Sequence, residues 1–221
     1  MAIEDDLLAE IQSNIGGAIP VGSTTATAAW DLFEVYILTL VVRAAEIDGA
    51  AVSFQNVNGS TATSLVFRTS PGQIWSTQNP YSHAVLQFPG RDALEAHIGV
   101  RVAGKSKVLH EFDVCVLSQA EAQSARLQRL PPRSSKVIIG VECKLYTTPL
   151  KLGLARAFIS LNADVSASAM FFVTNTFSAP VEQLLAARVS HWDQTVTPGA
   201  AKDVERFRNS CQTVFKTYKA R

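Results

Sequence analysis

Charged side chains recur two residues apart in two apolar segments of the chain. Glu111 and Asp113 lie within KVLHEFDVCVL, and Glu142 and Lys144 lie within KVIIGVECKLY. Residues two apart share one face of a β-strand, so the members of each pair point to the same side. If the two strands pair with each other, three carboxylates and one ammonium group converge.

Such a cluster suits metal-assisted phosphoryl chemistry. A hard divalent cation such as Mg²⁺ takes oxygen ligands and keeps several waters, so two carboxylates and a substrate phosphate can hold it. A lysine beside the ion can orient or deprotonate the attacking water and offset the charge that develops on phosphorus. Cys143 lies between the two charged residues of its strand and faces the other side with Val141, which predicts a small core residue.

The stretch just before the first acidic pair offers a different chemistry. Gly99, Gly104, Lys105 and Ser106 match the phosphate-loop pattern G-x-x-x-x-G-K-[ST]. A phosphate loop joins a buried strand to a helix, whereas apolar and polar residues alternate with period two on both sides of AGKS. We therefore expect a hairpin turn there, and nucleotide binding through residues 99–106 stands as the alternative.

The elements that carry these side chains can be read from hydrophobic periodicity. Helical spacing predicts helices over residues 4–15, 30–47, 150–161, 180–190 and 200–221. Short β-like runs predict strands over residues 51–57, 64–68, 83–88, 94–102, 107–117, 136–146 and 169–175. The Pro- and Ser-containing end of the polar stretch 118–135 predicts an exposed loop.

The order of these elements and motifs resembles the PD-(D/E)XK nuclease superfamily, which has the restriction-endonuclease-like fold. The resemblance covers about residues 28–175: a helix with Glu34, a strand with HEFDV, a strand with VECK, and a further helix. It implies that Asp113 and Glu142 are metal ligands, that the Cys143 carbonyl adds a third, and that Lys144 is the catalytic lysine. By the same resemblance, Glu34 is the glutamate that this superfamily places on the helix before the catalytic strands.

Two features depart from the superfamily's usual pattern. Phe112 stands before Asp113 where the motif has a proline, and a long run of expected hairpins separates the Glu34 helix from the Asp113 strand. Glu95, within that run, is the competing choice for the third acid. We favour Glu34, because a carboxylate on so apolar a helix needs a reason.

Other polar residues have two interpretations each. The resemblance implies that Lys151 and Arg156, on the helix after the catalytic strands, face nucleic acid, and the alternative is a pair of solvated surface charges. His110 alternates onto the face of Phe112, which favours a partly buried histidine over a catalytic one. The remaining histidines show no metal-ligand spacing; they are His83, His97 and His191.

Bulk properties exclude few classes of protein. A formal net charge of +1 neither marks nor rules out a nucleic-acid binder, because a local basic face matters more than the total. The 3 cysteines lack C-x-x-C spacing, which argues against a disulfide framework or a structural zinc site and fits a reducing cytoplasm. The acidic N-terminal segment and the lack of any long apolar run predict neither a secretory leader nor a membrane span.

These observations predict one α/β domain, a restriction-endonuclease-like mixed β-sheet flanked by helices with an extra β-hairpin insertion. We expect an N-terminal helix and linker over residues 1–27, a nuclease core over 28–175 with hairpins inserted at about 51–103, and C-terminal helices over 176–221. The expected function is Mg²⁺- or Mn²⁺-dependent endonucleolytic cleavage of DNA in restriction or anti-phage defence, by a homodimer or a subunit of a defence complex. The alternatives are a nucleotide-binding protein and an inactive nuclease-fold subunit that binds DNA or assembles with partners.

Overall fold

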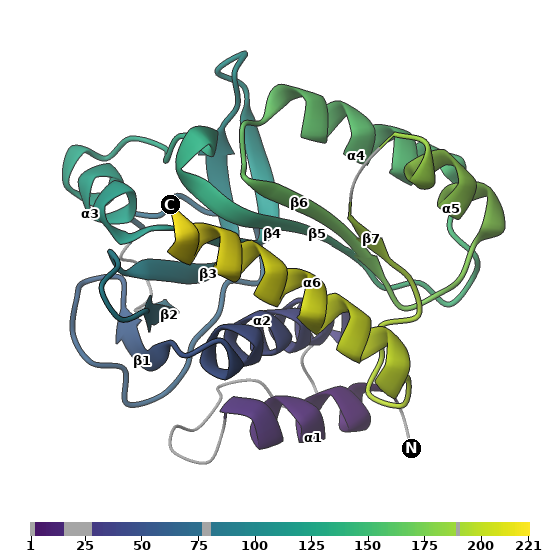
Figure 1. The fold of residues 1–221 in the computed structure, drawn as a ribbon, viewed down its shortest axis with the longest axis horizontal. Helices are drawn as coiled ribbons and strands as arrows, with labels where there is room; N and C mark the ends of the chain where they lie inside the picture. Colours follow the sequence, from purple (N-terminus) through teal and green to yellow (C-terminus); the bar gives the residue numbers. More distant parts are fainter. Residues whose placement is uncertain (1–2, 16–27, 77–80, 189–190) are drawn as a thin grey trace.

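The computed structural model describes residues 3–15, 28–76, 81–188 and 191–221. Its strands form one seven-stranded mixed sheet in which the spatial order follows the chain order, β1 to β7 (Figure 1). Neighbouring strands are antiparallel from β1 to β5, and β5, β6 and β7 are parallel. The strands are β1 Ala51–Asn56, β2 Ser82–Gln87, β3 Leu94–Ala103, β4 Leu109–Ser118, β5 Val137–Lys144, β6 Ala169–Thr174 and β7 Trp192–Asp193.

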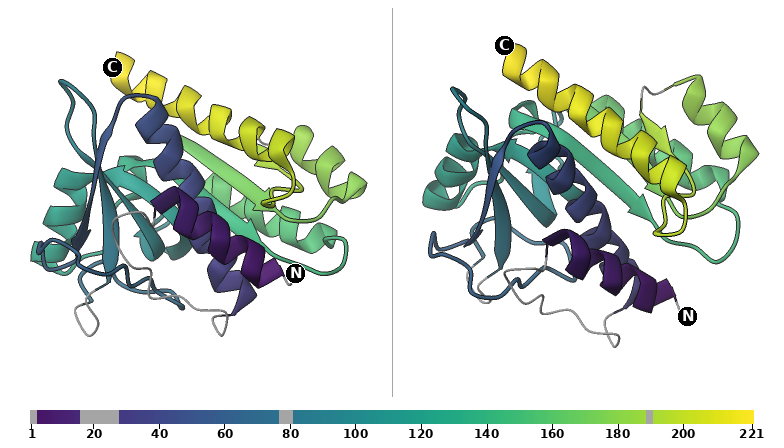
Figure 2. Two further views of the ribbon diagram at one scale, coloured as in Figure 1. Left: turned by 90° about the horizontal axis from the view of Figure 1, so that it is seen from below. Right: turned by 60° about the horizontal axis from the view of Figure 1, so that its bottom comes forward.

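Helices cover both faces of this sheet. On one face lie α2 and α6, with α1 packed against α2, and on the other lie α4 and α5 (Figures 1 and 2). Helix α3 follows β4 and packs into the same core as α4 and α5. The helices are α1 Ile3–Ile15, α2 Ala29–Ile47, α3 Gln119–Gln128, α4 Leu152–Asp164, α5 Ala179–Ala186 and α6 Ala201–Ala220.

The two central antiparallel strands exchange faces part of the way along their length. Ile98 of β3 and Val114 of β4 pair and pack into the α2–α6 core, but the next pair, Val100 and Phe112, packs into the α4–α5 core. Side chains two apart normally share a face, so the backbone must turn over between these pairs. Gly99 provides the turn with φ of +60°, and Asp113 lies at the corresponding point of β4.

Most of the predicted elements are confirmed, including the mixed α/β sheet flanked by helices and the turn at AGKS, which joins antiparallel β3 and β4. The expected hairpin insertion is not a separate unit, because β1, β2 and β3 extend the central sheet itself. The helix expected over residues 180–190 ends at Ala186, and residues 189–190 lie outside the described part. Of the predicted N-terminal linker, residues 16–27 also lie outside it.

One prediction from periodicity is wrong, and one helix was not predicted. Residues 64–68 are not a strand, since Leu65 is buried in a small core with Ile15 and Ala62 while the local backbone bonds irregularly to Ser82. The polar stretch after β4 begins with a helix, α3, for which the Ser118 hydroxyl accepts the N-terminal hydrogen bond from the Glu121 amide. A serine cap followed three residues later by glutamate is a helix-start signal that outweighs the polarity of the segment.

Replacing Gly99 with alanine should lower the free energy of unfolding by about 1–2 kcal/mol, because an L-residue is strained at this φ. The added methyl would also lie 3.3 Å from Arg68 Cβ and 3.4 Å from the Ser70 carbonyl oxygen. Gly153→Ala on α4 is the matched control, since its methyl meets nothing within 4 Å and should be neutral or stabilising by up to about 1 kcal/mol. Urea denaturation measures both, and equal effects would contradict the proposed role of Gly99.

Candidate active site

Three oxygen atoms converge on the ammonium group of Lys144. Its Nζ lies 2.6 Å from Glu142 Oε1, donates a hydrogen bond of 2.9 Å to the Cys143 carbonyl oxygen, and lies 3.7 Å from Asp113 Oδ2. Asp113 Oδ2 also accepts a hydrogen bond of 2.6 Å from the Cys143 amide, which fixes the carboxylate against β5. These oxygens belong to the three residues that the resemblance names as metal ligands.

The cluster opens into a pocket of about 300 Å³ between the sheet and α4. Acidic and basic side chains from β4 and β5 form one wall, and Ala157, Phe158 and Leu161 of α4 form an apolar wall opposite. Solvent and a small anionic group can therefore reach the charged atoms while one side stays dry. The polar lining consists of His110, Glu111, Asp113, Glu142 and Lys144.

The adjacency of β4 and β5 brings these side chains together as predicted, although β4 turns over at Asp113. β4 and β5 are adjacent and antiparallel, with Val114 opposite Val141. Glu142 and Lys144 face the pocket, whereas Cys143 packs with Val141 in the α2–α6 core, as expected for a small core residue. The pairing of β5 with β4 ends at Val141, and β6 continues to pair with β5 as far as Lys144 and supports the site from that side.

Burial and like charges at close range together determine the electrostatics of the site. Burial and the charge of Glu142 raise the pKa of Asp113 to about 7, against the opposing effects of Lys144 and the Cys143 amide. Burial alone would lower the pKa of Lys144, but the charges of Glu142 and Asp113 outweigh it and raise that pKa. Without a bound metal ion, Lys144 is therefore a cation that can orient groups and neutralise charge.

Glu34 belongs to this electrostatic group. Burial and the charges of Asp113, Asp31 and Glu111 together raise its pKa to about 9, against the opposing effect of Lys144. Glu34 is on α2, at the other side of β4 and β5 from α4, and does not line the pocket itself. We refer to Glu34, Glu111, Asp113 and Glu142 as the acidic group.

Glu95, the competing acid, lies elsewhere in the sheet. It pairs in register with Leu117, four residues along β4 from Asp113. Both of its oxygens accept hydrogen bonds from Arg126 of α3, at 2.7 and 2.8 Å, and His97 donates to Oε2 at 2.9 Å. Glu95 is thus a compensated buried ion that does not belong to this pocket, and Glu34 stays the predicted third acid.

The sequence-based view of His83 and His97 is incomplete. The fold places both beside Glu95, with potential metal-ligating atoms within 4.8 Å of one another, although the spacing in the sequence gives no such sign. Arg126 already pairs with Glu95, and the charges of Arg68 and Arg126 add to burial in lowering the pKa of each histidine. The same positive charges oppose a divalent cation, so the arrangement is better described as an ionic network that ties α3 to β3.

Lys151 and Arg156 are both exposed, at the start of α4 and on its first turns. Arg156 therefore lies on the helix that forms the apolar wall of the pocket, and Lys151 lies just before it. The residues 99–106 do not form a phosphate loop, because the chain continues from the turn into β4 and no helix begins at Lys105. The nucleotide-binding alternative therefore loses its structural basis.

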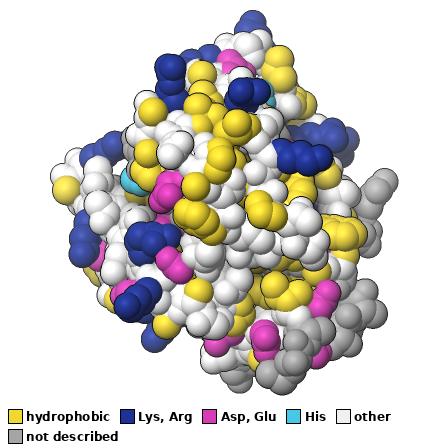
Figure 3. All heavy atoms as spheres, turned by 90° about the vertical axis from the view of Figure 1, so that its right-hand side faces the viewer, with side chains coloured by type: hydrophobic (Ala, Val, Ile, Leu, Met, Phe, Trp, Pro, Cys, Tyr) yellow, Lys and Arg dark blue, Asp and Glu magenta, His cyan; other side chains and the backbone are white. Residues whose placement is uncertain are grey.

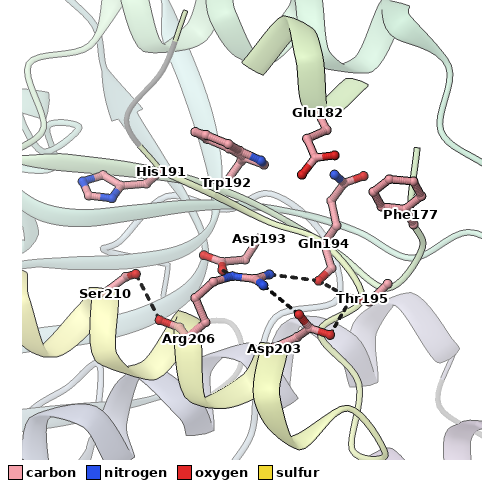
Figure 4. Close-up of a pocket in the computed structure, with 10 residues that line it drawn as sticks. All are labelled: Phe177, Glu182, His191, Trp192, Asp193, Gln194, Thr195, Asp203, Arg206 and Ser210. Carbon is pink, nitrogen blue, oxygen red and sulfur yellow. Dashed lines mark hydrogen bonds and ion pairs between the residues drawn. The ribbon is translucent and has the colours of Figure 1, made fainter. Parts of the chain in front are cut away.

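A larger pocket of about 480 Å³ lies at the β7 edge of the sheet, between α5 and α6 (Figure 4). Its one guanidinium group, on Arg206, is already bound by Asp193, Asp203 and the Gln194 carbonyl. Basic side chains on the coloured part of this face are interspersed with acidic and hydrophobic ones and form no continuous basic surface (Figure 3). The smaller pocket holds the more reactive set of groups, and we take it as the candidate active site.

Comparisons with protein-family profiles, with curated proteins and with solved structures gave no match for this chain. Among the residues that the structure describes, no helix is both long enough and apolar enough to cross a membrane.

Glu34→Gln should stabilise the protein by about 2 kcal/mol at pH 8 and change its stability little at pH 4. The folded pKa of about 9 exceeds the ordinary value of 4.5, so the stability that this carboxyl contributes is present below pH 4.5 and is lost as pH rises towards 9. Glutamine does not titrate and escapes that loss. Urea denaturation at both pH values tests this, and a destabilised variant at pH 8 would contradict it.

Glu95→Gln should show the opposite sign. Burial favours the neutral acid, but the hydrogen bonds from Arg126 and His97 outweigh it and hold the pKa of Glu95 well below 4.5. The ionised form therefore stabilises the fold above pH 4.5, and its loss should cost about 3–5 kcal/mol at pH 8 because Arg126 keeps an unpaired charge. The same denaturation series measures it, with the penalty shrinking as pH falls below 4.5.

Proposed function

We propose that this protein is a Mg²⁺- or Mn²⁺-dependent endonuclease that hydrolyses DNA phosphodiester bonds, as the resemblance to the PD-(D/E)XK superfamily implies. The observation that carries the proposal is the convergence of Glu142 Oε1, the Cys143 carbonyl and Asp113 Oδ2 on one cationic group at the mouth of a pocket. The setting that we propose is restriction or another defence against foreign DNA.

The residues present fit a hard divalent ion. The donor set is made entirely of oxygen, and Lys144 now satisfies oxygens that would otherwise repel one another. Burial and the charge of Glu142 make the ionised form of Asp113 unfavourable, as its raised pKa indicates, and a nearby positive charge makes that form more favourable. When bound, such an ion supplies Lewis-acid polarisation of the phosphate and of the attacking water.

The chain's own residues then have separate tasks. Asp113 and Glu142 are the proposed metal ligands, with the Cys143 carbonyl as a third. The ammonium of Lys144 would turn from these oxygens towards the phosphate, where it offsets the charge that develops on phosphorus. Glu34 on α2 contributes a further carboxyl group, whose charge interacts with that of Asp113.

The surface beside the pocket fits an extended anionic substrate. Lys151 and Arg156 are solvent-exposed on α4, so they can contact the phosphates that flank the scissile bond. Cleavage of both strands of a duplex needs two such sites, and we therefore propose a homodimer or a larger defence complex as the working form.

Asp113→Asn should abolish Mg²⁺-dependent cleavage of plasmid DNA and weaken Mn²⁺ binding at least about tenfold by calorimetry, because it removes a ligand charge. Lys144→Ala should also lower cleavage by about 10²-fold or more, but its Mn²⁺ affinity should equal or exceed that of the wild type, since no ammonium then competes for the oxygens.

Lys136→Ala, just before β5 and remote from the pocket, is the matched control and should leave both measurements unchanged. Wild-type protein that binds Mn²⁺ at this site and yet cleaves no DNA would favour the inactive binding subunit. Cleavage that survives Asp113→Asn undiminished would show that the assigned site is wrong.

A further inference from the structure

An aspartate–histidine pair stands at the rim of the candidate active site. His110 of β4 lines the pocket with Lys144 and Asp113, and its Nε2 lies 2.6 Å from Asp164 Oδ2 at the end of α4. Asp164 also accepts hydrogen bonds from the Ser106 amide at 2.9 Å and the Ser106 hydroxyl at 2.5 Å. These donors hold the pKa of Asp164 down, at about 2, so that the carboxylate stays charged beside the imidazole.

The ring of His110 has only one edge available to a substrate. A methyl built on Gly104 would lie 2.9 Å from both Cδ2 and Nε2, so that edge packs against the hairpin turn. Nδ1 is on the opposite edge, has no hydrogen bond within the described part of the chain, and is not among its buried unpartnered atoms. With Nε2–H directed at Asp164, the imidazolium form carries its second acidic proton on Nδ1.

The proposed hydrolysis lacks a proton donor in the groups discussed so far. Breaking the bond between phosphorus and a bridging oxygen releases a strongly basic alkoxide. Transfer of a proton to this oxygen in the transition state accelerates the reaction by about 10²–10⁴-fold. Lys144 already has the task of offsetting the charge on the phosphate, which leaves the leaving oxygen to another group. His110 and Glu111 are the candidate donors left in the lining of this pocket, and of the two only His110 is held by a carboxylate partner, Asp164.

Building on the proposed nuclease function, we propose that His110 is the general acid that protonates the leaving oxygen, and that Asp164 positions it. The water oxygen forms a bond to phosphorus, the bond from phosphorus to the bridging oxygen breaks, and the Nδ1 proton of His110 passes to that oxygen. The proton that the water loses returns the neutral imidazole to its charged form by way of solvent, so each turnover consumes one water and leaves His110 unchanged. Asp164 acts through the ring and does not contact the substrate.

A substrate with a better leaving group tests this role. The wild-type cleavage position is first mapped on a synthetic duplex in Mg²⁺, and the 3′- or the 5′-bridging oxygen at that position is then replaced by sulfur. A thiolate leaves without protonation, so the loss in a variant that lacks the acid should disappear on one of the two sulfur duplexes. His110→Gln is the main variant, because its amide can still donate to Asp164 and hold the hairpin.

His110→Gln and His110→Ala should each cleave the all-oxygen duplex about 10²-fold more slowly than the wild type and cleave one sulfur duplex within about threefold of it. Asp164→Asn should show a smaller loss with the same rescue, and His191→Ala, a histidine in the other pocket, should match the wild type on every duplex. Duplex binding in Ca²⁺, followed by fluorescence anisotropy, should be equal for all of them.

An equal loss on oxygen and sulfur duplexes, or no loss at all in His110→Gln, would overturn the role of His110 while leaving the nuclease function intact. A wild-type protein that cleaves none of the duplexes in Mg²⁺ or Mn²⁺ would overturn the nuclease function, and the role of His110 with it. The two failures are therefore distinguishable.

Discussion

The arrangement of this protein depends on holding like charges together against their repulsion. The acidic group places four carboxyls around the single ammonium of Lys144, and the pKa values of Asp113 and Glu34 rise to about 7 and about 9 as a result of burial and of this crowding. Nothing in the packing of a stable fold requires such a cluster, because hydrophobic residues in the same places would be less costly. Such a cluster, on two central strands and the helix α2 that packs on them, is typical of a functional site.

The buried acids fall into two kinds that the structure separates. Glu95 has two hydrogen bonds from Arg126 and one from His97, so its charge is matched and its pKa falls. Glu34 is only partly buried by comparison, but the negative charges of other carboxylates act on it, and its pKa rises. Glu95 is therefore a structural ion. Ionised Glu34 is unfavourable, and a bound cation would reduce this cost. The two glutamates thus have different roles.

Period-two alternation predicted correctly that Glu111, Asp113, Glu142 and Lys144 share one pocket, and that AGKS is a turn. It could not reveal the exchange of faces at Gly99, because alternation assumes that a strand keeps its sides. Nor could it find Asp164, which is 54 residues from His110 and meets it only because α4 returns across the sheet to the hairpin. Contacts of that kind depend on tertiary packing, and no local pattern encodes them.

The motif that resembles a phosphate loop has a structural reason in this fold. Gly104 lacks a side chain where a Cβ would lie 2.3 Å from Asp164 Oδ2, so any other residue would push the carboxylate away from His110. Ser106 supplies two of the donors that bind that carboxylate, and the Lys105 amide bonds the Asp164 carbonyl at 2.7 Å. Gly104 and Ser106 thus allow the hairpin turn to bind the C-terminal end of α4. A sequence that fits a nucleotide-binding pattern serves instead to orient a histidine at the edge of the acidic group.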